Sequence, residues 1–296
     1  MLITGAARGI GAGTARALAA RGAKVALVGL EPDELAQVAA TCGPDAAWFE
    51  ADVTDRAALE AAVAGTVERF GGIDVVMANA GIGTGGPVRA IDPETWERVL
   101  EVNLLGSWRT IRAALPHVIA RRGYVLQIAS LAAIAHAPFM SAYAASKAGV
   151  EAFANALRTE VAHHGVDVGV AYFSWIDTDM VRGADERAAW GGMRRRMSGP
   201  LAKTASLETC VAATVAGIEQ RRRWIAVPGW VRAALLLRGP LSVLLDRAAR
   251  REVPTVEQQM LAAAEREGAA VFAPTGAGGA ADVAARARRA GAGEAA

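Results

Sequence analysis

Tyr143 and Lys147 stand four residues apart in the stretch SAYAASKAGVE, residues 141–151. The chain has three tyrosines and three lysines in all, and it carries most of its positive charge on arginine. Side chains at positions i and i+4 share one face of a helix, and an ammonium beside a phenol lowers the pKa of the phenol below its usual value of about 10. The pair therefore predicts an acid–base centre that moves one proton at a substrate oxygen.

A glycine-rich turn, TGAARGIG, follows the first apolar residues of the chain. Gly5, Gly9 and Gly11 fall between a predicted strand and a predicted helix, where glycine lets the backbone turn sharply and approach a ligand closely. The free N–H groups at the start of the helix favour the negative charge of a pyrophosphate. The turn predicts a nucleotide site, with the spacing T-G-x-x-x-G-x-G rather than G-x-G-x-x-G.

Further motifs follow these two in order along the chain: Asn79-Ala80-Gly81 at the end of the fourth predicted strand, Asn103 in VNLLG, and Ser130 thirteen residues before Tyr143. The ordered set resembles the classical short-chain dehydrogenase/reductase family over roughly residues 1–230. The resemblance implies an NAD(P)(H)-dependent oxidoreductase that interconverts a secondary alcohol and a ketone or aldehyde by hydride transfer. It also implies a homodimer or homotetramer, formed through the helices that carry Asn103 and Tyr143.

The resemblance assigns catalytic roles to Asn103, Ser130, Tyr143 and Lys147. Tyr143 acts as acid or base, and the positive ring of the oxidised nicotinamide joins Lys147 in lowering its pKa to about 7. Lys147 also holds the hydroxyls of the nicotinamide ribose. Ser130, which taken alone is equally a polar strand end, hydrogen-bonds the substrate oxygen. Asn103 holds a water of a proton relay at a kink in its helix.

The cofactor contacts that the resemblance implies begin in the glycine turn and end after the sixth predicted strand. They are Gly5, Arg8, Gly9, Ile10, Gly11, Asp52, Val53, Asn79, Ala80, Gly81, Tyr143, Lys147, Ile176 and Thr178. At the position that reads the adenosine ribose, Gly29 and Leu30 carry no charge and Glu31 follows late, whereas Arg8 suits a 2′-phosphate. This balance slightly favours NADP(H) over NAD(H). Asp52 contacts adenine in relatives, or alternatively caps the next helix.

The residues after the sixth strand are expected to form the substrate side of the site. Relatives carry Pro-Gly there, whereas this chain has Phe173 and Ser174, which alters the shape of the site. The expected lid, residues 179–200, contains four apolar side chains that suit an apolar ligand, Met180, Trp190, Met193 and Met197. Arg194 to Arg196 in the same segment either meet an acid group or face solvent. The prediction is a small, lipophilic alcohol or carbonyl substrate.

The histidines carry no predicted chemistry. His117, His136, His163 and His164 lack metal-ligand spacing, so no metal site is predicted. His136 and Phe139, just before the tyrosine, are expected at the mouth of the substrate site.

The elements expected to position these residues alternate between apolar strands and alanine-rich helices, one of which covers residues 93–123. Strands that are apolar throughout are typical of parallel sheets covered on both faces. The pattern predicts a doubly wound parallel sheet, a Rossmann-type α/β/α sandwich, with a helical C-terminal extension.

Three regions are expected along the chain. Residues 1–230 form the catalytic domain. Residues 231–268 form an apolar helical extension that serves as substrate lid, subunit interface or peripheral membrane contact. Residues 269–296 are rich in alanine, glycine and arginine without periodicity, which predicts a disordered tail.

Composition narrows the classes of function. Apolar residues make up 53% of the chain and charged residues 21%, which is typical of a globular protein, and a net charge of +2 favours no nucleic-acid partner. Cys42 and Cys210 predict free thiols in a reducing cytoplasm. The first predicted strand begins so close to Met1 that it is either clipped or preceded by an upstream start. The sequence predicts no signal peptide, and it contains no apolar run long enough to span a bilayer.

Two other functions stay open. A non-catalytic NAD(P)-sensing protein shares the fold, although such proteins typically lose the tyrosine or the lysine. A dehydratase or epimerase branch fits the glycine spacing less well.

Overall fold

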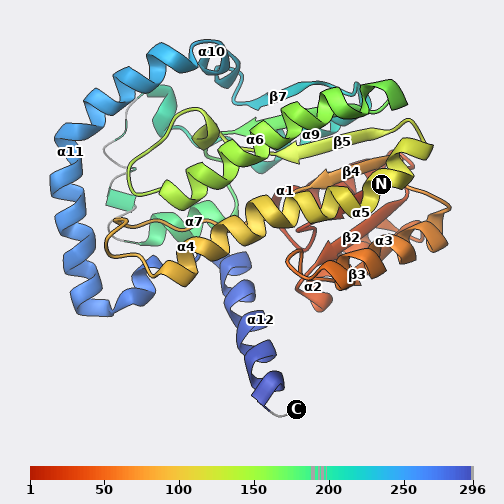
Figure 1. The fold of residues 1–296 in the computed structure, drawn as a ribbon, viewed down its shortest axis with the longest axis horizontal. Helices are drawn as coiled ribbons and strands as arrows, with labels where there is room; N and C mark the ends of the chain where they lie inside the picture. Colours follow the sequence, from red (N-terminus) through yellow and green to blue (C-terminus); the bar gives the residue numbers. More distant parts are fainter. Residues whose placement is uncertain (188–190, 193, 195–196, 198, 295–296) are drawn as a thin grey trace.

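Seven parallel strands form one sheet in the order β3-β2-β1-β4-β5-β6-β7 (Figure 1). The strands are β1 (Leu2–Thr4), β2 (Val25–Gly29), β3 (Ala46–Glu50), β4 (Val75–Ala78), β5 (Tyr124–Ile128), β6 (Asp167–Phe173) and β7 (Trp224–Val227). Every residue of β2 is buried, whereas the edge strand β3 is only partly buried. The structure is a computed structural model and describes residues 1–187, 191, 192, 194, 197 and 199–294. The predicted doubly wound parallel sheet is confirmed.

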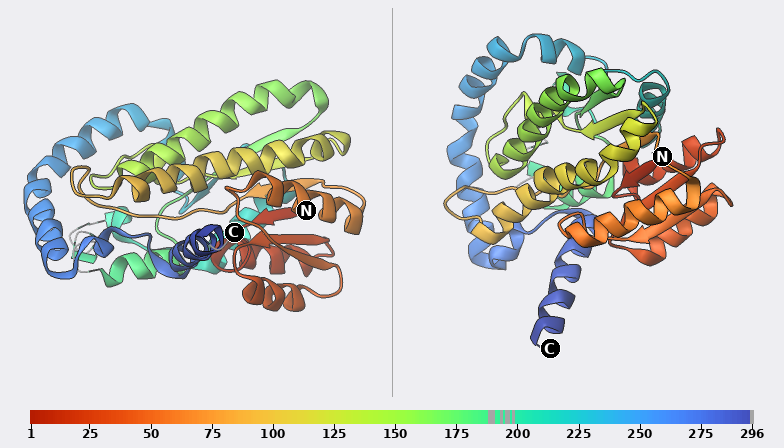
Figure 2. Two further views of the ribbon diagram at one scale, coloured as in Figure 1. Left: turned by 60° about the horizontal axis from the view of Figure 1, so that its bottom comes forward. Right: turned by 45° about the vertical axis from the view of Figure 1, so that its right-hand side comes forward.

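Helices cover both faces of this sheet (Figure 2). The helices up to the sixth strand are α1 (Gly9–Ala19), α2 (Pro32–Cys42), α3 (Arg56–Phe70), α4 (Pro93–Leu100), η1 (Glu101–Leu105), α5 (Gly106–Ala120), η2 (Leu131–Ala133), α6 (Ser141–Val161) and η3 (Ala162–His164). Those after it are α7 (Asp179–Glu186), η4 (Gly199–Ala202), α9 (Leu207–Glu219), α10 (Val231–Leu236), α11 (Arg238–Glu267), η5 (Ala269–Phe272) and α12 (Gly276–Glu294). One apolar core lies between the sheet and α1, α2 and α9, and the other between the sheet and α3 to α6.

Short polar side chains set where several helices begin. Asp55 accepts a hydrogen bond from the N–H of Ala58 at the start of α3, and Asp92 accepts one from Thr95 at the start of α4. Each carboxylate satisfies a backbone donor that has no partner within its helix and meets the positive end of the helix dipole. These caps fix the loops between strands and helices, which carry the site.

The helix expected over residues 93–123 is divided in the structure. The π-helical turn η1 separates α4 from α5, and it contains the buried Asn103. A π turn inserts an extra residue into a helix and redirects the side chains that it carries. The kink expected at Asn103 is therefore a π turn.

The region after β7 wraps around one end of the sheet. α10 and α11 form the predicted helical extension, and α11 runs along the edge of the molecule in Figure 1. Among the described residues, no helix combines the length and the apolar character that a bilayer span needs.

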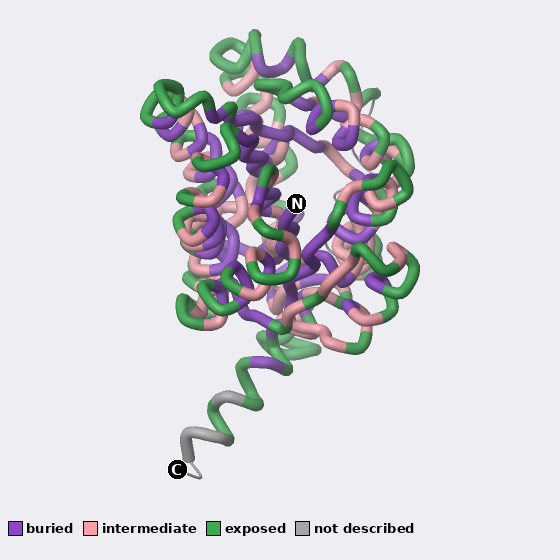
Figure 3. The backbone as a smooth tube through the Cα atoms, turned by 90° about the vertical axis from the view of Figure 1, so that its right-hand side faces the viewer, coloured by how far each residue is buried: buried purple, intermediate pink, exposed green. Residues whose placement is uncertain are grey.

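The disorder expected after residue 268 is contradicted by the structure, which has η5 and the long helix α12 there. Alanine and arginine are strong helix formers. Thr275, Gly279, Asp282 and Ala285 are also buried, at spacings of four, three and three residues that place them on one face. The outer half of α12 projects away from the body of the molecule (Figure 3).

Candidate active site

The glycine turn lies against the end of β4. Gly5 has a φ of +62°, and a Cβ atom there would lie 2.8 Å from the Cα of Ala80. The Asn79 side chain donates hydrogen bonds to the carbonyls of Thr4 (2.9 Å) and Gly5 (3.1 Å). β1 and β4 are neighbours at the point where the strand order reverses, and parallel sheets bind ligands at this point. The turn is thus shaped to let a ligand approach the backbone.

Asn103 fixes the loop after β4. Its side-chain oxygen accepts from the N–H of Ile82 (2.8 Å), and its amide donates to the carbonyl of Ile82 (2.9 Å) and the hydroxyl of Ser146 (3.0 Å). Ser146 in turn donates to the carbonyl of Tyr143 at 2.8 Å. The amide of Asn103 thereby connects the π turn, the loop after β4 and the first turn of α6, which carries the tyrosine.

Lys147 is buried at the base of the site. Its Nζ donates to the carbonyl of Ile128 at 2.8 Å and lies 5.6 Å from the centre of the Tyr143 ring. Burial lowers the pKa of Lys147 to about 8, because an ammonium loses hydration in the interior. The lysine and tyrosine share one face of α6, as their spacing predicts.

The pKa of Tyr143 differs from the expectation. Burial raises it above its usual value, and an interaction with the Ser130 side chain offsets only part of this rise. The ammonium of Lys147 lies 5.6 Å from the centre of the Tyr143 ring and donates its hydrogen bond to the carbonyl of Ile128. Lowering this pKa to about 7 is therefore not achieved by the protein's own side chains.

Two cavities meet at the tyrosine. The first, of about 230 Å³, follows the glycine turn and the ends of β1 to β6; the second, of about 360 Å³, lies beneath α7 and α11. The residues that line both are Ser130, Tyr143, Ser174, Met180, Val181 and Thr275. Ser130 lies at the end of β5, and its hydroxyl donates to the carbonyl of Phe173 (3.2 Å). A ligand in one cavity therefore meets a ligand in the other beside Ser130 and Tyr143.

The first cavity, hereafter the nucleotide cavity, gathers most of the predicted cofactor residues. It is lined by Gly5, Arg8, Gly9, Ile10, Asp52, Val53, Asn79, Ala80, Gly81, Tyr143, Lys147, Ile176 and Thr178. Gly11 and Asn103 lie behind its wall. A Cβ on Gly11 would collide with the carbonyl of Gly5, so this glycine serves the packing of the turn.

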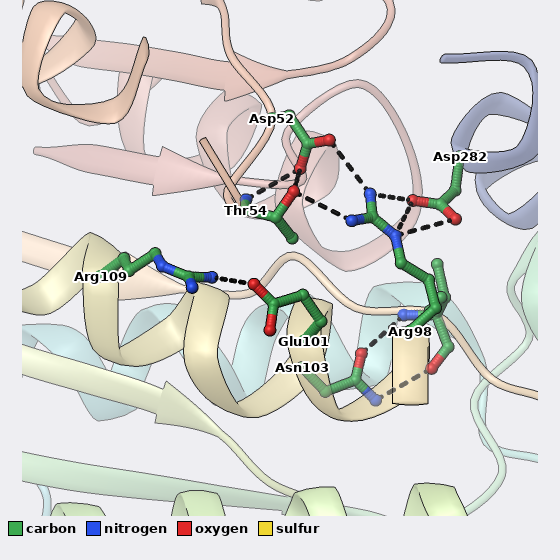
Figure 4. A network of polar contacts seen from close by, with 8 residues as sticks. Asp52, Thr54, Arg98, Glu101, Asn103, Arg109 and Asp282 are labelled. Atoms are coloured by element: carbon green, nitrogen blue, oxygen red, sulfur yellow. Dashed lines mark hydrogen bonds and ion pairs between the residues drawn. The ribbon is translucent and has the colours of Figure 1, made fainter. Parts of the chain in front are cut away.

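Two charged clusters lie in this cavity. Arg8 forms an ion pair with Glu31 and lies 3.6 Å from carboxylate oxygens of both Glu34 and Asp179. Asp52 accepts from the N–H and the hydroxyl of Thr54, both at 2.8 Å, and pairs with Arg98 at 3.0 Å (Figure 4). Burial alone would raise the pKa of Asp52, but these hydrogen bonds and the guanidinium hold it below its usual value. Asp52 does not cap α3, because Asp55 does.

The second cavity, hereafter the apolar cavity, has few polar groups. His136 and Phe139 line it as predicted, together with Trp175 and the lid residues Met180 and Met197. Its far wall is the inner face of α11, formed by Leu245, Ala248, Ala249, Glu252, Val253 and Val256. The Oγ of Ser174 is buried without a hydrogen-bond partner in the described part of the chain.

The remaining lid predictions divide into two groups. Trp190, Met193, Arg195 and Arg196 lie outside the described residues. Arg194 pairs with Asp185 and stacks over Trp175 at 4.3 Å, so its charge is already engaged. Within the described residues, no cluster of histidine, cysteine, aspartate or glutamate is arranged to hold a metal ion.

Sequence reasoning missed one part of the nucleotide cavity. Thr275, Gly278, Gly279, Ala281 and Asp282 line it from the C-terminal region. The sequence TGAGGAAD has the elements of a glycine turn before an alanine-rich helix, but the low-complexity composition around it masked that signal.

Comparison with known proteins agrees with this geometry. The model of the short chain dehydrogenase family matches residues 1–189. The chain belongs to this family. As a short-chain dehydrogenase, it is an NAD(P)-dependent oxidoreductase that acts on alcohol or ketone substrates.

Individual relatives share the catalytic region. Galactitol 2-dehydrogenase of Agrobacterium fabrum is 36% identical over 196 residues, which cover 65% of this chain and 77% of the relative. Trans-4-hydroxycyclohexanecarboxylate dehydrogenase of Sinomonas cyclohexanicum is 37% identical over 191 residues, 62% of this chain and 74% of the relative. The crystal structure of levodione reductase superposes with a TM-score of 0.71 at 29% identity, covering 79% of this chain and 97% of that one. A 3-ketoacyl-(acyl-carrier-protein) reductase from Brucella melitensis, complexed with NADH, has a TM-score of 0.69 at 26% identity over 76% of this chain and 95% of that one.

Proposed function

We propose that this dehydrogenase interconverts a lipophilic secondary alcohol and its ketone or aldehyde, with Tyr143 as the acid–base group. The proposal rests on the observation that Ser130 and Tyr143 line both cavities. One of these cavities contains the glycine turn, and the other is apolar. The alternative, a protein that senses NAD(P) without catalysis, is disfavoured because the chain retains Tyr143 at the junction of the cavities and the buried Lys147 in the nucleotide cavity.

The polar residues at and beside the junction of the cavities have distinct roles in this proposal. The hydroxyl of Ser130 donates a hydrogen bond to the substrate oxygen and orients the carbon beneath it. Tyr143 donates its proton to that oxygen in reduction and accepts one in oxidation. Lys147 holds the hydroxyls of the nicotinamide ribose. The unpartnered hydroxyl of Ser174 is a further donor for the substrate or the carboxamide.

The residues present fit a nicotinamide cofactor, since the glycine turn leaves space that a Cβ would fill. Gly5, Gly9 and Ile10 would hold the pyrophosphate, and Ile176 and Thr178 the carboxamide. The bound cofactor supplies or accepts the hydride, and its oxidised ring adds a positive charge. That charge is a source of the pKa lowering that the protein alone does not give Tyr143.

The residues around Arg8 affect the choice between NAD(H) and NADP(H). The sequence slightly favours NADP(H) through Arg8, but the pairing of Arg8 with Glu31 weakens this argument. Glu31 lines the nucleotide cavity and occupies the guanidinium that a 2′-phosphate would need. A carboxylate at this place accepts hydrogen bonds from ribose hydroxyls and repels a phosphate. We therefore propose that Glu31 shifts the preference towards NAD(H). The Brucella melitensis relative, complexed with NADH, supports this choice.

The walls of the apolar cavity support the substrate class. Methionines, alanines and aromatic rings form most of its lining, and such walls bind hydrocarbon surface without demanding polar partners. The ring of hydroxycyclohexanecarboxylate, named for one relative, is a hydrocarbon surface of this kind. A polyol such as galactitol, named for another relative, would leave its hydroxyls unpaired in this cavity.

The proposal is tested by two measurements on the full chain. Fluorescence titration with NADH and NADPH reports cofactor binding and its preference. A panel of cyclic, aromatic and long-chain carbonyl compounds, beside a sugar ketone as the polar control, is then followed by the absorbance of the reduced cofactor. Turnover of apolar carbonyls above the sugar ketone supports the proposal. Cofactor binding without turnover of any compound would favour the sensor instead.

Two assembly predictions accompany the proposal. A homodimer or homotetramer through α5 and α6 is tested by light scattering of the purified protein. Peripheral membrane contact is supported by the strongly exposed Leu236, Leu237, Val243 and Leu244, beside Arg232 and Arg247. Flotation with vesicles that contain anionic lipid tests this contact, and exchange of Leu236 and Leu244 for serine should abolish any binding that depends on it.

A further inference from the structure

The C-terminal segment crosses between two parts of the site. The N–H of Thr275 donates to the carbonyl of Gly83 at 2.8 Å, and Thr84 donates to the carbonyl of Phe272, so the segment is joined to the loop after β4. On its other side, Arg187 at the end of α7 donates to the carbonyl of Val271 at 2.9 Å. The buried Phe272 and Thr275 anchor this crossing. The start of α12 is therefore held in place before it reaches the nucleotide cavity.

The first turns of α12 form one wall of that cavity. Gly278, Gly279, Ala281 and Asp282 line it with the glycine turn and Val53 on other sides. These residues lie beyond the match of the family model, which ends at residue 189. The wall is thus a feature of this chain in addition to the glycine turn and the strand ends.

A buried ionic cluster holds this wall in place. The guanidinium of Arg98, on α4, lies between two carboxylates: Asp282 at 2.6 Å and Asp52 at 3.0 Å (Figure 4). Its Nη1 also donates to the hydroxyl of Thr54 at 2.9 Å. The side chains of Asp52 and Asp282 are each only 2% exposed, and that of Arg98 is 12% exposed.

This ionic cluster is important because it lies beside the nucleotide cavity. Removing one partner of a buried ion pair leaves an uncompensated charge, so the three groups constrain one another closely. Burial alone would lower the pKa of Arg98, but its bonds to Asp282 and Asp52 outweigh this and raise it. Asp52 itself lines the nucleotide cavity. The cluster therefore connects α12 directly to a side chain expected at the adenine.

We propose that residues 275–282 are part of the nucleotide-binding site, and that Asp282 is the positioning residue that holds them there by pairing with Arg98, which in turn pairs with Asp52. The inference rests on the proposed function, because it takes the ligand of the cavity to be NAD(H) or NADP(H). With Asp282 in place, the wall closes over the adenosine half of the cofactor and slows its release. Without Asp282, α12 loses its buried anchor and Arg98 keeps only one carboxylate partner.

The test compares Asp282→Ala and Asp282→Asn with a matched control on the same helix. Arg286→Ala removes an exposed ion pair with Glu94, at 3.1 Å, and leaves the buried cluster intact. The Kd of NADH is measured by fluorescence and the dissociation rate by stopped flow. Asp282→Ala should raise the Kd by about tenfold or more through faster dissociation, Asp282→Asn by less, and Arg286→Ala by less than about twofold. The kcat at saturating cofactor should stay close to that of the wild type in the control Arg286→Ala.

A second readout separates positioning from simple stabilisation. Trypsin cleaves after arginine, and Arg286 and Arg288 lie in the exposed part of α12. Saturating NADH should slow this cleavage in the wild type, and in Arg286→Ala it should slow cleavage at Arg288. In Asp282→Ala, NADH should not slow the cleavage. A lowered Tm with an unchanged Kd would show that the cluster is only structural and would overturn the inference. A tighter Kd in Asp282→Ala would overturn it too, because α12 would then obstruct the site. If the wild type binds neither NADH nor NADPH, it is the proposed function that fails.

Discussion

The nucleotide cavity and the apolar cavity share Tyr143 but are built in different ways. Backbone turns at the strand ends form most of the nucleotide cavity, and hydrogen bonds such as those from Asn79 to Thr4 and Gly5 lock them. The apolar cavity is enclosed mainly by side chains, which come from residues 130–143, α7 and α11. Backbone geometry tolerates little change, whereas a wall of side chains tolerates exchange of one apolar residue for another.

The two cavities also draw on different parts of the chain. The residues proposed to move the proton, and most of those that line the nucleotide cavity, lie within the family match, which ends at residue 189. The far wall of the apolar cavity lies after it, on α11. Substitutions that act on one cavity alone, or on the residue between them, should expose this division.

The largest effect is expected at the residue that both cavities share. Tyr143→Phe removes the transferable proton and should lower kcat by about 1,000-fold, while the Kd of NADH changes little. Steady-state kinetics and fluorescence titration measure the two quantities. Tyr124→Phe is the matched control: its hydroxyl donates to the carbonyl of Arg222 far from the site, so its loss should cost stability by about 1 kcal/mol and leave kcat intact. Full activity in Tyr143→Phe would exclude the mechanism.

A second effect concerns the buried cation of the nucleotide cavity. The native pKa of Lys147 is about 8, below its unfolded value of 10.5, so the unfolded state binds more protons between these two pH values. Stability conferred by neutral Lys147 therefore rises as pH increases from about 8 to 10.5, and it is lost as pH falls from 10.5 to about 8. Urea unfolding of the wild type and Lys147→Met should show a difference that changes by about 3 kcal/mol across this window. A difference independent of pH would contradict the lowered pKa.

The nucleotide cavity alone should respond to Gly5→Ala. The added Cβ meets the backbone of Ala80 at a positive φ, so the turn must shift and the Kd of NADH should rise by about 30-fold. Gly22 has a φ of +86° but open space around it, and Gly22→Ala is therefore the control for backbone strain without collision. Comparable losses of cofactor affinity in both variants would show that the cradle does not depend on close approach.

The apolar cavity alone should respond to Val253→Asp. This change places a carboxylate on the inner face of α11 and should raise the KM of apolar substrates by about tenfold, with the Kd of NADH unchanged. Val243 lies on the same helix but is 52% exposed, so Val243→Asp should leave KM unaltered. Equal KM values in the two variants would place the substrate elsewhere.

Most of the residues predicted to contact the cofactor gather in the nucleotide cavity, because local chemistry fixes their positions. Glycine turns, strand ends and an i, i+4 pair have the same geometry wherever the sheet forms, and Gly5, Ser130, Tyr143 and Lys147 lie where their motifs place them. The pKa of Tyr143 was beyond prediction, since it depends on burial and on where the ammonium of Lys147 points.

The C-terminal third was harder to predict for a different reason. Its structure depends on long-range partners that no local pattern encodes. Asp282 is separated from Arg98 by 184 positions, and their contact is one of the long-range interactions that hold an alanine- and glycine-rich segment in place. Likewise, Arg8 looked free to bind phosphate until the fold brought Glu31 beside it.

The projecting part of α12 has a mechanical consequence. From Asp282 to its end at Glu294 the helix extends for about 18 Å, at about 1.5 Å per residue. A small rotation at the buried cluster therefore produces a larger displacement at the end of the helix. A tilt of about 10° at the pivot would carry its tip through about 3 Å, by the same helical rise. A fluorophore attached near the tip, at Ala290, would convert small rearrangements around the nucleotide into a readable displacement, while standing clear of every group that performs the chemistry.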